Sequence, residues 1–346
     1  MDNQRNLILA VLLSIVVLFG FDLVVSKYYP TPKPSEQVHQ TAPAAGTTAP
    51  SAVKRTREGG LTDPAEEAEE ARDLATALRT TGRVRIDAPE VAGSINPVGA
   101  RVDDIELKTH RQTVDRNSGP VRLFSPAGTP AQQYAQFGWV APKGSAAIKL
   151  PDAQTQWQAS GGPLAPGRPV TLTWDNGEGQ RFTIRFTVDQ YYMLTAEQTV
   201  ANTGTQPVSL QPYAFLNRTS RTASQDTWYV HSGPIGLFNG KVDFGWNYKD
   251  IDKAGTARPE GQAGWIGFTD IYWLSVLVPQ AGAHVAADYR ARGGESYSAD
   301  MLYDPVAVAP GTQVTRTTRL FAGAKESTVL DRYEDAGVSK FGLSID

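Results

Sequence analysis

The chain has 346 residues, a net charge of −3 and no cysteine. Without cysteine it can form neither disulfides nor thiolate-ligated zinc sites, and thiolate catalysis is excluded as well. The small net charge supplies no overall positive field that would attract nucleic acid. The 32 glycines and 23 prolines are spread through much of the chain, and frequent turn residues between short apolar runs indicate β structure.

An apolar run opens the chain. Residues 7–25 read LILAVLLSIVVLFGFDLVV and are apolar on all sides, as expected for a helix surrounded by lipid. At about 1.5 Å of rise per residue the run spans roughly 28 Å, close to the thickness of a bilayer core. Tyr28 and Tyr29 follow it, where aromatic rings suit the headgroup layer. We therefore predict a transmembrane helix at 7–25, preceded by a short segment at 1–6.

A cleaved signal peptide is the alternative for this run. Such a peptide has a shorter apolar region followed by a small-x-small cleavage site, and the following sequence SKYYPTPKP lacks that site. Asp22 marks the outer interface or, in the alternative reading, a functional carboxylate inside the membrane. The flanking charges, Arg5 before the helix and Lys27 and Lys33 after it, leave the positive-inside rule close to neutral.

Residues 26–82 are expected to be a linker rich in proline, alanine and threonine. Its sequence has no apolar periodicity, so it cannot bury enough surface to offset the entropy of ordering. Within it, residues 63–78 read DPAEEAEEARDLATAL. Asp63 is a suitable N-cap, Pro64 suits the first helical position, and acidic residues crowd the first turn. These features predict a short, exposed, acidic helix.

The period changes to two between residues 83 and 324. Phe182, Ile184, Phe186 and Val188 alternate with polar residues and share one face. Turn sequences such as 176–177, 202–204 and 310–311 separate many runs of this kind. Many short strands in one long segment predict an all-β fold, a large β-sandwich.

The segment 325–346 is expected to close the domain. Val329, Leu330 and Tyr333 fall at helical spacing, and Gly337 can follow the helix end. We predict a short amphipathic C-terminal helix.

No catalytic, cofactor or metal site is predicted. The histidines His39, His110, His231 and His284 are isolated, with no metal-ligand spacing around them. The glycine-rich run 233–240 lacks the lysine of a phosphate loop and is expected to be a hairpin or loop.

Aromatic residues are plentiful and admit two interpretations. On a concave sheet they would stack on sugars or a peptide, but more often such residues form the core and rim of a sandwich. The residues concerned are Trp139, Trp157, Trp174, Trp228, Tyr229, Trp246, Tyr248, Trp265, Tyr272 and Trp273.

The order of these segments resembles the YidC-type membrane protein insertases of Gram-negative bacteria. The opening MDNQRNL, the proline-rich linker and the segment VRIDAPEVAGSINPVGARVDDIELKTHR carry the resemblance, which continues through FTIRFTVDQYYMLTAEQTVANTGTQPVSL and GWIGFTDIYWLSVLVP. It ends with PVAVAPGTQVTRTTRLFAGAKE and LDRYEDAGVSKFGLSID. No single motif is specific, but the ordered set covers essentially the whole chain. The resemblance implies a galactose-mutarotase-like supersandwich.

The resemblance also implies a function and a cellular location. The family's insertase core is five membrane helices around a hydrophilic groove with an arginine, and no apolar run of membrane length follows residue 25. We therefore expect the N-terminal part of an insertase, a docking domain without insertase activity of its own and not an enzyme. The parent would aid insertion and folding of membrane proteins, alone or with the Sec translocon.

The expected partners are the lipid bilayer, nascent membrane proteins through the missing core, and Sec components, with no nucleic acid and no cofactor. The expected location is the bacterial inner membrane, with a cytoplasmic N-terminus and a periplasmic sandwich. One alternative is a membrane-anchored, mutarotase-like periplasmic enzyme, which would need a carboxylate and a histidine in one groove. The other is a periplasmic module that binds a glycan or peptide.

Overall fold

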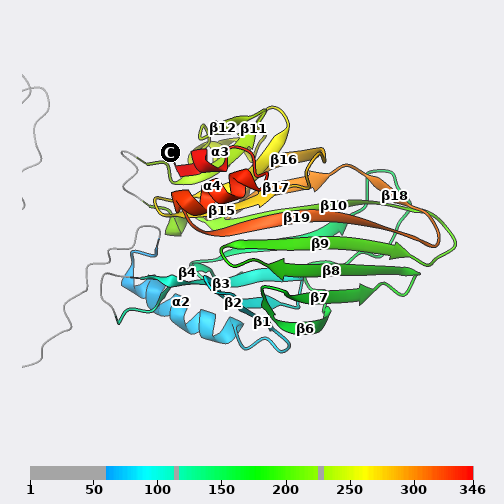
Figure 1. Ribbon diagram of the computed structural model, residues 1–346, viewed down its shortest axis with the longest axis horizontal. Helices are drawn as coiled ribbons and strands as arrows, with labels where there is room; N and C mark the ends of the chain where they lie inside the picture. Colours follow the sequence, from blue (N-terminus) through cyan, green and yellow to red (C-terminus); the bar gives the residue numbers. More distant parts are fainter. Residues whose placement is uncertain (1–59, 113–116, 225–229, 346) are drawn as a thin grey trace, which may run out of the picture. The chain divides into compact units, whose positions relative to one another are not determined.

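The computed structural model describes residues 60–112, 117–224 and 230–345. The predicted membrane helix at 7–25 and most of the linker lie outside these residues, as do His39, Trp228 and Tyr229. In the part of the chain that is described, no helix is both long and apolar enough to cross a bilayer. Strands dominate this part (Figure 1), which confirms the predicted all-β class.

The first of two sheets takes its strands from both the early and the late parts of the domain. Neighbouring strands in it are antiparallel, except that β1 and β6 are parallel. In order across the sheet its strands are β6 (Gln158–Ala165), β1 (Val84–Asp87), β2 (Val91–Asn96), β3 (Arg101–Arg111), β5 (Gln133–Val140), β10 (Val208–Thr219), β17 (Ser296–Tyr303), β16 (Val285–Gly293) and β13 (Thr256–Ala257). Strand β4 (Pro120–Phe124) pairs with β3 beside β5.

The second sheet is antiparallel, and β6 joins it to the first sheet by pairing with β7. After β6, its strands in order are β7 (Arg168–Asp175), β8 (Gln180–Val188), β9 (Met193–Asn202), β19 (Thr312–Ala324), β15 (Trp273–Val278), β14 (Ala263–Thr269), β11 (Gly233–Phe238) and β12 (Lys241–Asp243). A short strand, β18 (Val306–Val308), pairs with the start of β10. The glycine-rich run 233–240 thus forms β11 and its turn into β12, a hairpin, which is one of the two forms that the sequence predicts.

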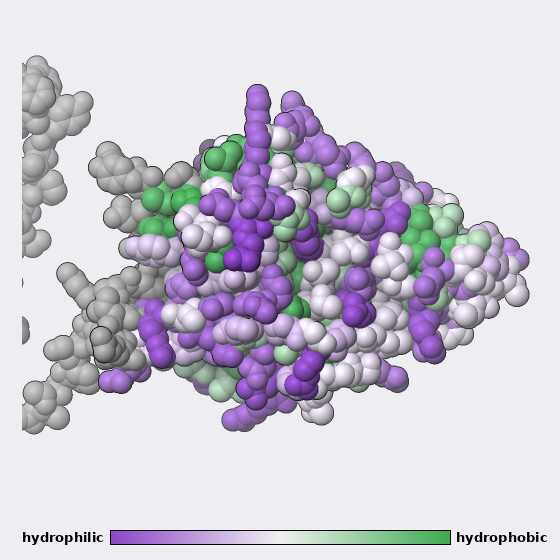
Figure 2. Space-filling view, in the orientation of Figure 1, coloured by the Kyte–Doolittle hydropathy of each residue, from purple (hydrophilic) through white to green (hydrophobic). Residues whose placement is uncertain are grey.

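The two sheets pack face to face around an aromatic core. Phe137 of β5 meets Phe186 of β8 edge-on, with ring centroids 5.7 Å apart, and the Gln198 side chain of β9 donates a 2.8 Å hydrogen bond to the Gly138 carbonyl of β5. Along β8 the side chains alternate between core and solvent as predicted, with Phe186 fully buried and Arg185 on the outside. The outer surface over β7, β8, β9 and β19 is mostly hydrophilic or neutral (Figure 2).

Helix α2 (Pro64–Ala77) precedes the sandwich and lies along its outside (Figure 1). The Asp63 carboxylate accepts a hydrogen bond from the Ala65 amide at 2.8 Å, and Pro64 occupies the first turn, as the sequence predicts. No residue of α2 is buried. In the described residues between α2 and the last strand, the short helices are η1 (Ser220–Thr222) and α3 (Tyr248–Ala254).

The C-terminal segment is docked into the sandwich. Helix α4 (Ser327–Asp335) buries Val329, Leu330 and Tyr333, the residues predicted from helical spacing. The Tyr333 hydroxyl donates to the Asp189 carboxylate at 2.7 Å. Beyond α4, η2 (Phe341–Ile345) buries Phe341 against the core. This packing makes α4 and η2 part of the domain.

Candidate functional site beneath helix α2

The histidines in the described residues do not form a metal centre. Within that part of the chain no three histidine, aspartate or glutamate side chains are placed to share a metal ion. His110 packs edge-on against Trp273 with ring centroids 5.4 Å apart, and His231 Nε2 lies 2.7 Å from the Pro234 carbonyl. His110 lies in β3 and His231 lies just before β11, and the two do not belong to one cluster.

His284 and Asp304 form a pair that sequence reasoning missed. The His284 Nδ1 and the Asp304 carboxylate are 2.9 Å apart, in a surface hollow also lined by Tyr303 and Arg316. The two side chains are 65% and 66% exposed. Because solvent screens such an exposed pair, it lacks the shielded setting in which an acid–base pair is strongly activated.

Most of the tryptophans and tyrosines singled out in the sequence belong to the core. Trp139, Trp157, Trp265 and Trp273 are buried. The partly buried members of the set pack against the same core: Trp174, Trp246 and Tyr248. Only Tyr272, among those that the structure describes, is largely exposed. The core interpretation therefore accounts for most of them.

A cavity of about 260 Å³ lies between α2 and the sandwich. Apolar residues line much of it, including Leu74 of α2, Leu123 of β4 and Phe268 of β14. Polar lining groups are Arg218 at the end of β10, Asp270 just after β14, and Glu70 of α2. The cavity is thus walled by elements that are far apart in the sequence.

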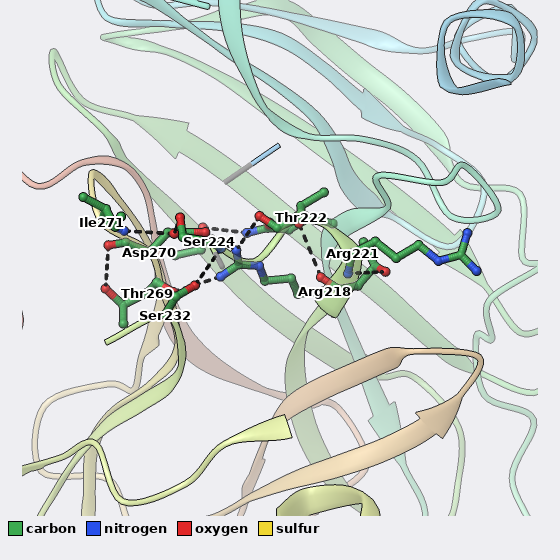
Figure 3. Close-up of polar contacts among 11 residues, drawn as sticks. Arg218, Arg221, Thr222, Ser224, Ser232, Thr269, Asp270 and Ile271 are labelled. Atoms are coloured by element: carbon green, nitrogen blue, oxygen red, sulfur yellow. Dashed lines mark hydrogen bonds and ion pairs between the residues drawn. The ribbon is translucent and has the colours of Figure 1, made fainter. Parts of the chain in front are cut away.

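A buried ion pair forms part of this wall. The Arg218 guanidinium pairs with the Asp270 carboxylate, and the two side chains are 4% and 3% exposed. Arg218 also donates to the Thr269 carbonyl at 2.9 Å and to the Thr222 carbonyl at 3.3 Å. Asp270 accepts further hydrogen bonds from the Ser224 hydroxyl and from the Ile271 amide (Figure 3). The cluster fixes both charges in one orientation.

The sequence contains one signal for Arg218. In β10, Ala214 and Leu216 point into the core, and Arg218 follows in the same alternation. A charge on the core face of a strand is expensive unless it is paired. Although burial works against its charge, the neighbouring Tyr248 and Asp270 raise the pKa of Arg218 above its usual range, so the guanidinium stays charged.

Polar contacts attach α2 over this cavity. The Glu70 carboxylate accepts a 2.8 Å hydrogen bond from the Ala131 amide. Glu66 lies 3.5 Å from Arg221, which pairs more closely with Glu295 at 2.9 Å. These contacts explain why a helix without a buried residue lies on the sandwich.

A second ionic network borders the cavity on β2, β3 and β4. Arg83 pairs with Asp103, and Arg122 pairs with Asp104. The Ser94 hydroxyl donates to Asp104 at 2.7 Å and links the two pairs. Burial raises the pKa of Asp103, against the hydrogen bond and charge of Arg83. Both of these aspartates have a cationic partner, so neither carboxylate is left uncompensated.

The chemistry of the cavity favours binding over catalysis. Among the carboxylates that line it, Asp270 is held by three donors, and the cation paired with it is a guanidinium, which does not exchange protons near neutral pH. What the cavity offers is a set of oriented hydrogen-bonding groups among apolar side chains, the usual composition of a ligand site.

Comparisons with known proteins point to one family. The profile described as the YidC periplasmic domain matches residues 83–346. The chain is similar to the membrane protein insertase YidC of Zymomonas mobilis, with 38% identity over 96% of this chain and 55% of that protein. The corresponding protein of Bradyrhizobium diazoefficiens is 39% identical over 95% of this chain and 55% of its own length.

The same protein of Methylorubrum extorquens is 37% identical over 100% of this chain and 59% of its own length. The chain therefore spans between 55% and 59% of the length of these relatives.

Solved structures give weaker likenesses of fold. A putative aldose 1-epimerase from Escherichia coli K12 has a TM-score of 0.45 and 9% identity, over 70% of this chain and 99% of that one. A galactose mutarotase-like protein from Clostridium acetobutylicum has a TM-score of 0.43 and 7% identity, over 69% of this chain and 94% of that one. No activity follows from likenesses at this level.

Proposed function

The chain belongs to the YidC family of membrane protein insertases, and from this premise we propose that it is the membrane-tethered periplasmic part of such an insertase. In this role it aids insertion and folding of membrane proteins, alone or with the Sec translocon. The observation that carries the proposal is the family match over 83–346, which takes in every strand of the sandwich together with α4 and η2.

The proposed organisation follows the order of segments. Residues 1–6 are cytoplasmic, 7–25 cross the inner membrane, 26–82 form the linker with its acidic helix, 83–324 form the periplasmic sandwich, and 325–346 lead onward. One feature of the fold supports this arrangement. Helix α2 begins, and the segment after α4 ends, toward the same end of the domain (left in Figure 1). That end is therefore suited to face the membrane.

The proposal assigns the insertase step to membrane helices outside this chain. A water-soluble sandwich does not lower the cost of moving polar loops through lipid, because unsatisfied backbone groups and charges are expensive in hydrocarbon. A single tethering helix offers no protected polar path either. The chain is instead a docking domain, and Sec components are its proposed protein partners.

We also propose that the chain is not an enzyme. The mutarotase-like alternative needs a histidine and a carboxylate in one shielded groove, and His284 with Asp304 is a largely exposed pair. The purified chain should not accelerate anomer interconversion of glucose above the buffer rate. If it does, and if His284→Ala abolishes the acceleration, the enzymatic alternative replaces this part of the proposal.

Alkaline phosphatase fused after Asp346 tests the topology. The fusion should be active in an exporting bacterium, because the helix at 7–25 carries the domain across the membrane. Deleting residues 7–25 from the same fusion is the matched control and should abolish activity. Activity confined to a cytoplasmic reporter at the same position would contradict the topology.

Complementation and crosslinking test the role. The chain alone, correctly inserted and abundant, should not rescue cells depleted of their insertase. In the longer parent protein, photo-crosslinkers at the exposed position Arg185 of β8 and at Glu69 of α2 should capture Sec components from at least one of these two surfaces. Rescue by the chain alone would refute the docking assignment, and absence of Sec adducts from both surfaces would remove the Sec partner.

A further inference from the structure

We propose that the cavity beneath α2 binds a short peptide segment through one apolar side chain and the adjoining amide, and that α2 is the lid of this site. The inference concerns the described domain alone and does not depend on the insertase role. It rests on four features: a hydrogen-bond donor and an acceptor without partners, the volume of the cavity, the charges that line it, and the few contacts that hold helix α2.

Two hydrogen-bonding atoms on residues that line the cavity have no partner among the residues that the structure describes. They are the Nε–H donor of Arg218 and the Oε1 acceptor of Glu70, and both atoms are buried. Such atoms normally find a partner, and an orphaned buried group is a reason to look for a ligand or water. One donor and one acceptor match the two polar atoms of an amide, whose carbonyl accepts and whose N–H donates.

The size of the cavity restricts what it can hold. At about 260 Å³ it is slightly smaller than typical small-molecule sites, which begin at roughly 300 Å³. An apolar cavity of about 150 Å³ is enough for a benzene ring. The space therefore suits one aliphatic or aromatic side chain with its amide and is too small for an oligosaccharide. Leu74, Leu123 and Phe268 supply the apolar contacts.

The charges favour a neutral ligand over an anion. The positive charge of Arg218 is already balanced by Asp270, and Arg122 is held by Asp104 and Glu106. Glu70 adds a negative charge on the α2 side. A free carboxylate would meet this charge without a spare cation, whereas an amide brings no charge and carries both an acceptor for the Nε–H and a donor for Oε1.

Helix α2 has the properties of a lid. It contributes no buried residue, and its polar contacts with the sandwich include the Glu70 bond to Ala131 and the long Glu66 pair with Arg221. Elements with few buried contacts open at low free-energy cost. Opening α2 would expose the side of the cavity that Leu74 and Ala71 cover.

The test uses the full chain in lipid nanodiscs and a peptide of sequence Ac-Ser-Gly-X-Gly-Ser-NH2, where X is a diazirine analogue of leucine. After irradiation, adducts are located by mass spectrometry. The expected adducts lie on cavity residues such as Leu74, Leu123 and Phe268, and excess peptide with ordinary leucine should suppress them. Two competitors probe the chemistry. A peptide with serine at X lacks the apolar group, and a peptide N-methylated at X lacks the amide donor; both should compete at least tenfold more weakly.

Matched variants on α2 test the site without touching the core. Ala71→Trp fills the cavity from the lid and should reduce cavity adducts at least tenfold, whereas Ala68→Trp, also exposed but outside the cavity wall, should leave them unchanged. Glu70→Ala should reduce them by about tenfold or more, the loss expected for a hydrogen bond to a charged group. Glu69→Ala is its control. Circular dichroism of each variant verifies that the domain remains folded.

The outcomes separate the parts of the proposal. Cavity adducts that are lost in Ala71→Trp and Glu70→Ala but kept in both controls support it. Adducts scattered over the outer surface, or cavity adducts unaffected by Ala71→Trp, overturn the binding site. Equal competition by the serine and leucine peptides overturns recognition of an apolar side chain. Equal competition by the N-methylated peptide overturns recognition of the amide. None of these results bears on complementation or topology, so failure here leaves the proposed function standing.

Discussion

Replacing Asp270 with asparagine removes the negative charge that balances Arg218 inside the domain. Both side chains are nearly inaccessible, with 4% of Arg218 and 3% of Asp270 exposed. The guanidinium keeps its carbonyl contacts to Thr269 and Thr222, but no solvent replaces the lost carboxylate charge. Breaking a buried ion pair from one side typically costs about 3–5 kcal/mol. Because asparagine can keep the hydrogen bond from Ser224, the expected loss in free energy of unfolding is about 3 kcal/mol.

Urea unfolding, followed by tryptophan fluorescence, measures this loss, provided that the m-value is the same in the variant and the parent chain. The exposed pair Arg185–Glu197, at 2.9 Å with 44% and 38% exposure, is the control, and Glu197→Gln should cost under about 1 kcal/mol. The double variant Arg218→Met with Asp270→Asn should recover part of the loss, because no isolated buried charge remains. An Asp270→Asn cost as small as that of the surface pair, or no recovery in the double variant, would refute the reasoning.

Three further changes test the packing of the core, the stability of the domain at alkaline pH and the attachment of the C-terminal helix. Phe186→Ala should lower the free energy of unfolding by about 3–5 kcal/mol, and Arg185→Ala on the opposite face by under about 1 kcal/mol; equal losses in urea titrations would contradict the half-buried strand. Burial first, and then a hydrogen bond to a carboxylate, raises the pKa of Tyr297 to about 12 from 10.0. The folded state therefore keeps this proton when the unfolded chain has lost it, so the free energy of unfolding should fall between about pH 10 and 12. If the Tyr297→Phe variant shows the same dependence of unfolding free energy on pH, that assignment is contradicted. Tyr333→Phe removes the 2.7 Å bond to Asp189 and should cost about 1–3 kcal/mol, with no change in the urea midpoint as the refuting result.

The local sequence pattern was enough to predict the strands and helices in which apolar side chains recur at a regular spacing. Phe186 and its neighbours alternate along β8 because one face meets the core and the other meets water. Val329, Leu330 and Tyr333 of α4 follow helical spacing for the same reason. The division of the strands between two sheets could not be predicted in this way. The pairing of β9 with β19 joins residues 116 positions apart at one contact, and no local pattern records such a partner.

The cavity beneath α2 escaped prediction because most of its parts have an ordinary local explanation. Glu70 belongs to an acidic helical face, and only the tertiary structure shows that it reaches the Ala131 amide. Asp270 lies 52 positions from Arg218, just after β14 and outside any period. Arg218 alone departs from its surroundings, since a charge follows Ala214 and Leu216 on the core face of β10. Such a residue requires an opposite charge inside the domain. In an all-β sequence without a recognisable motif, the charged residue that is in phase with the core is therefore the position from which a search for a buried polar site should start.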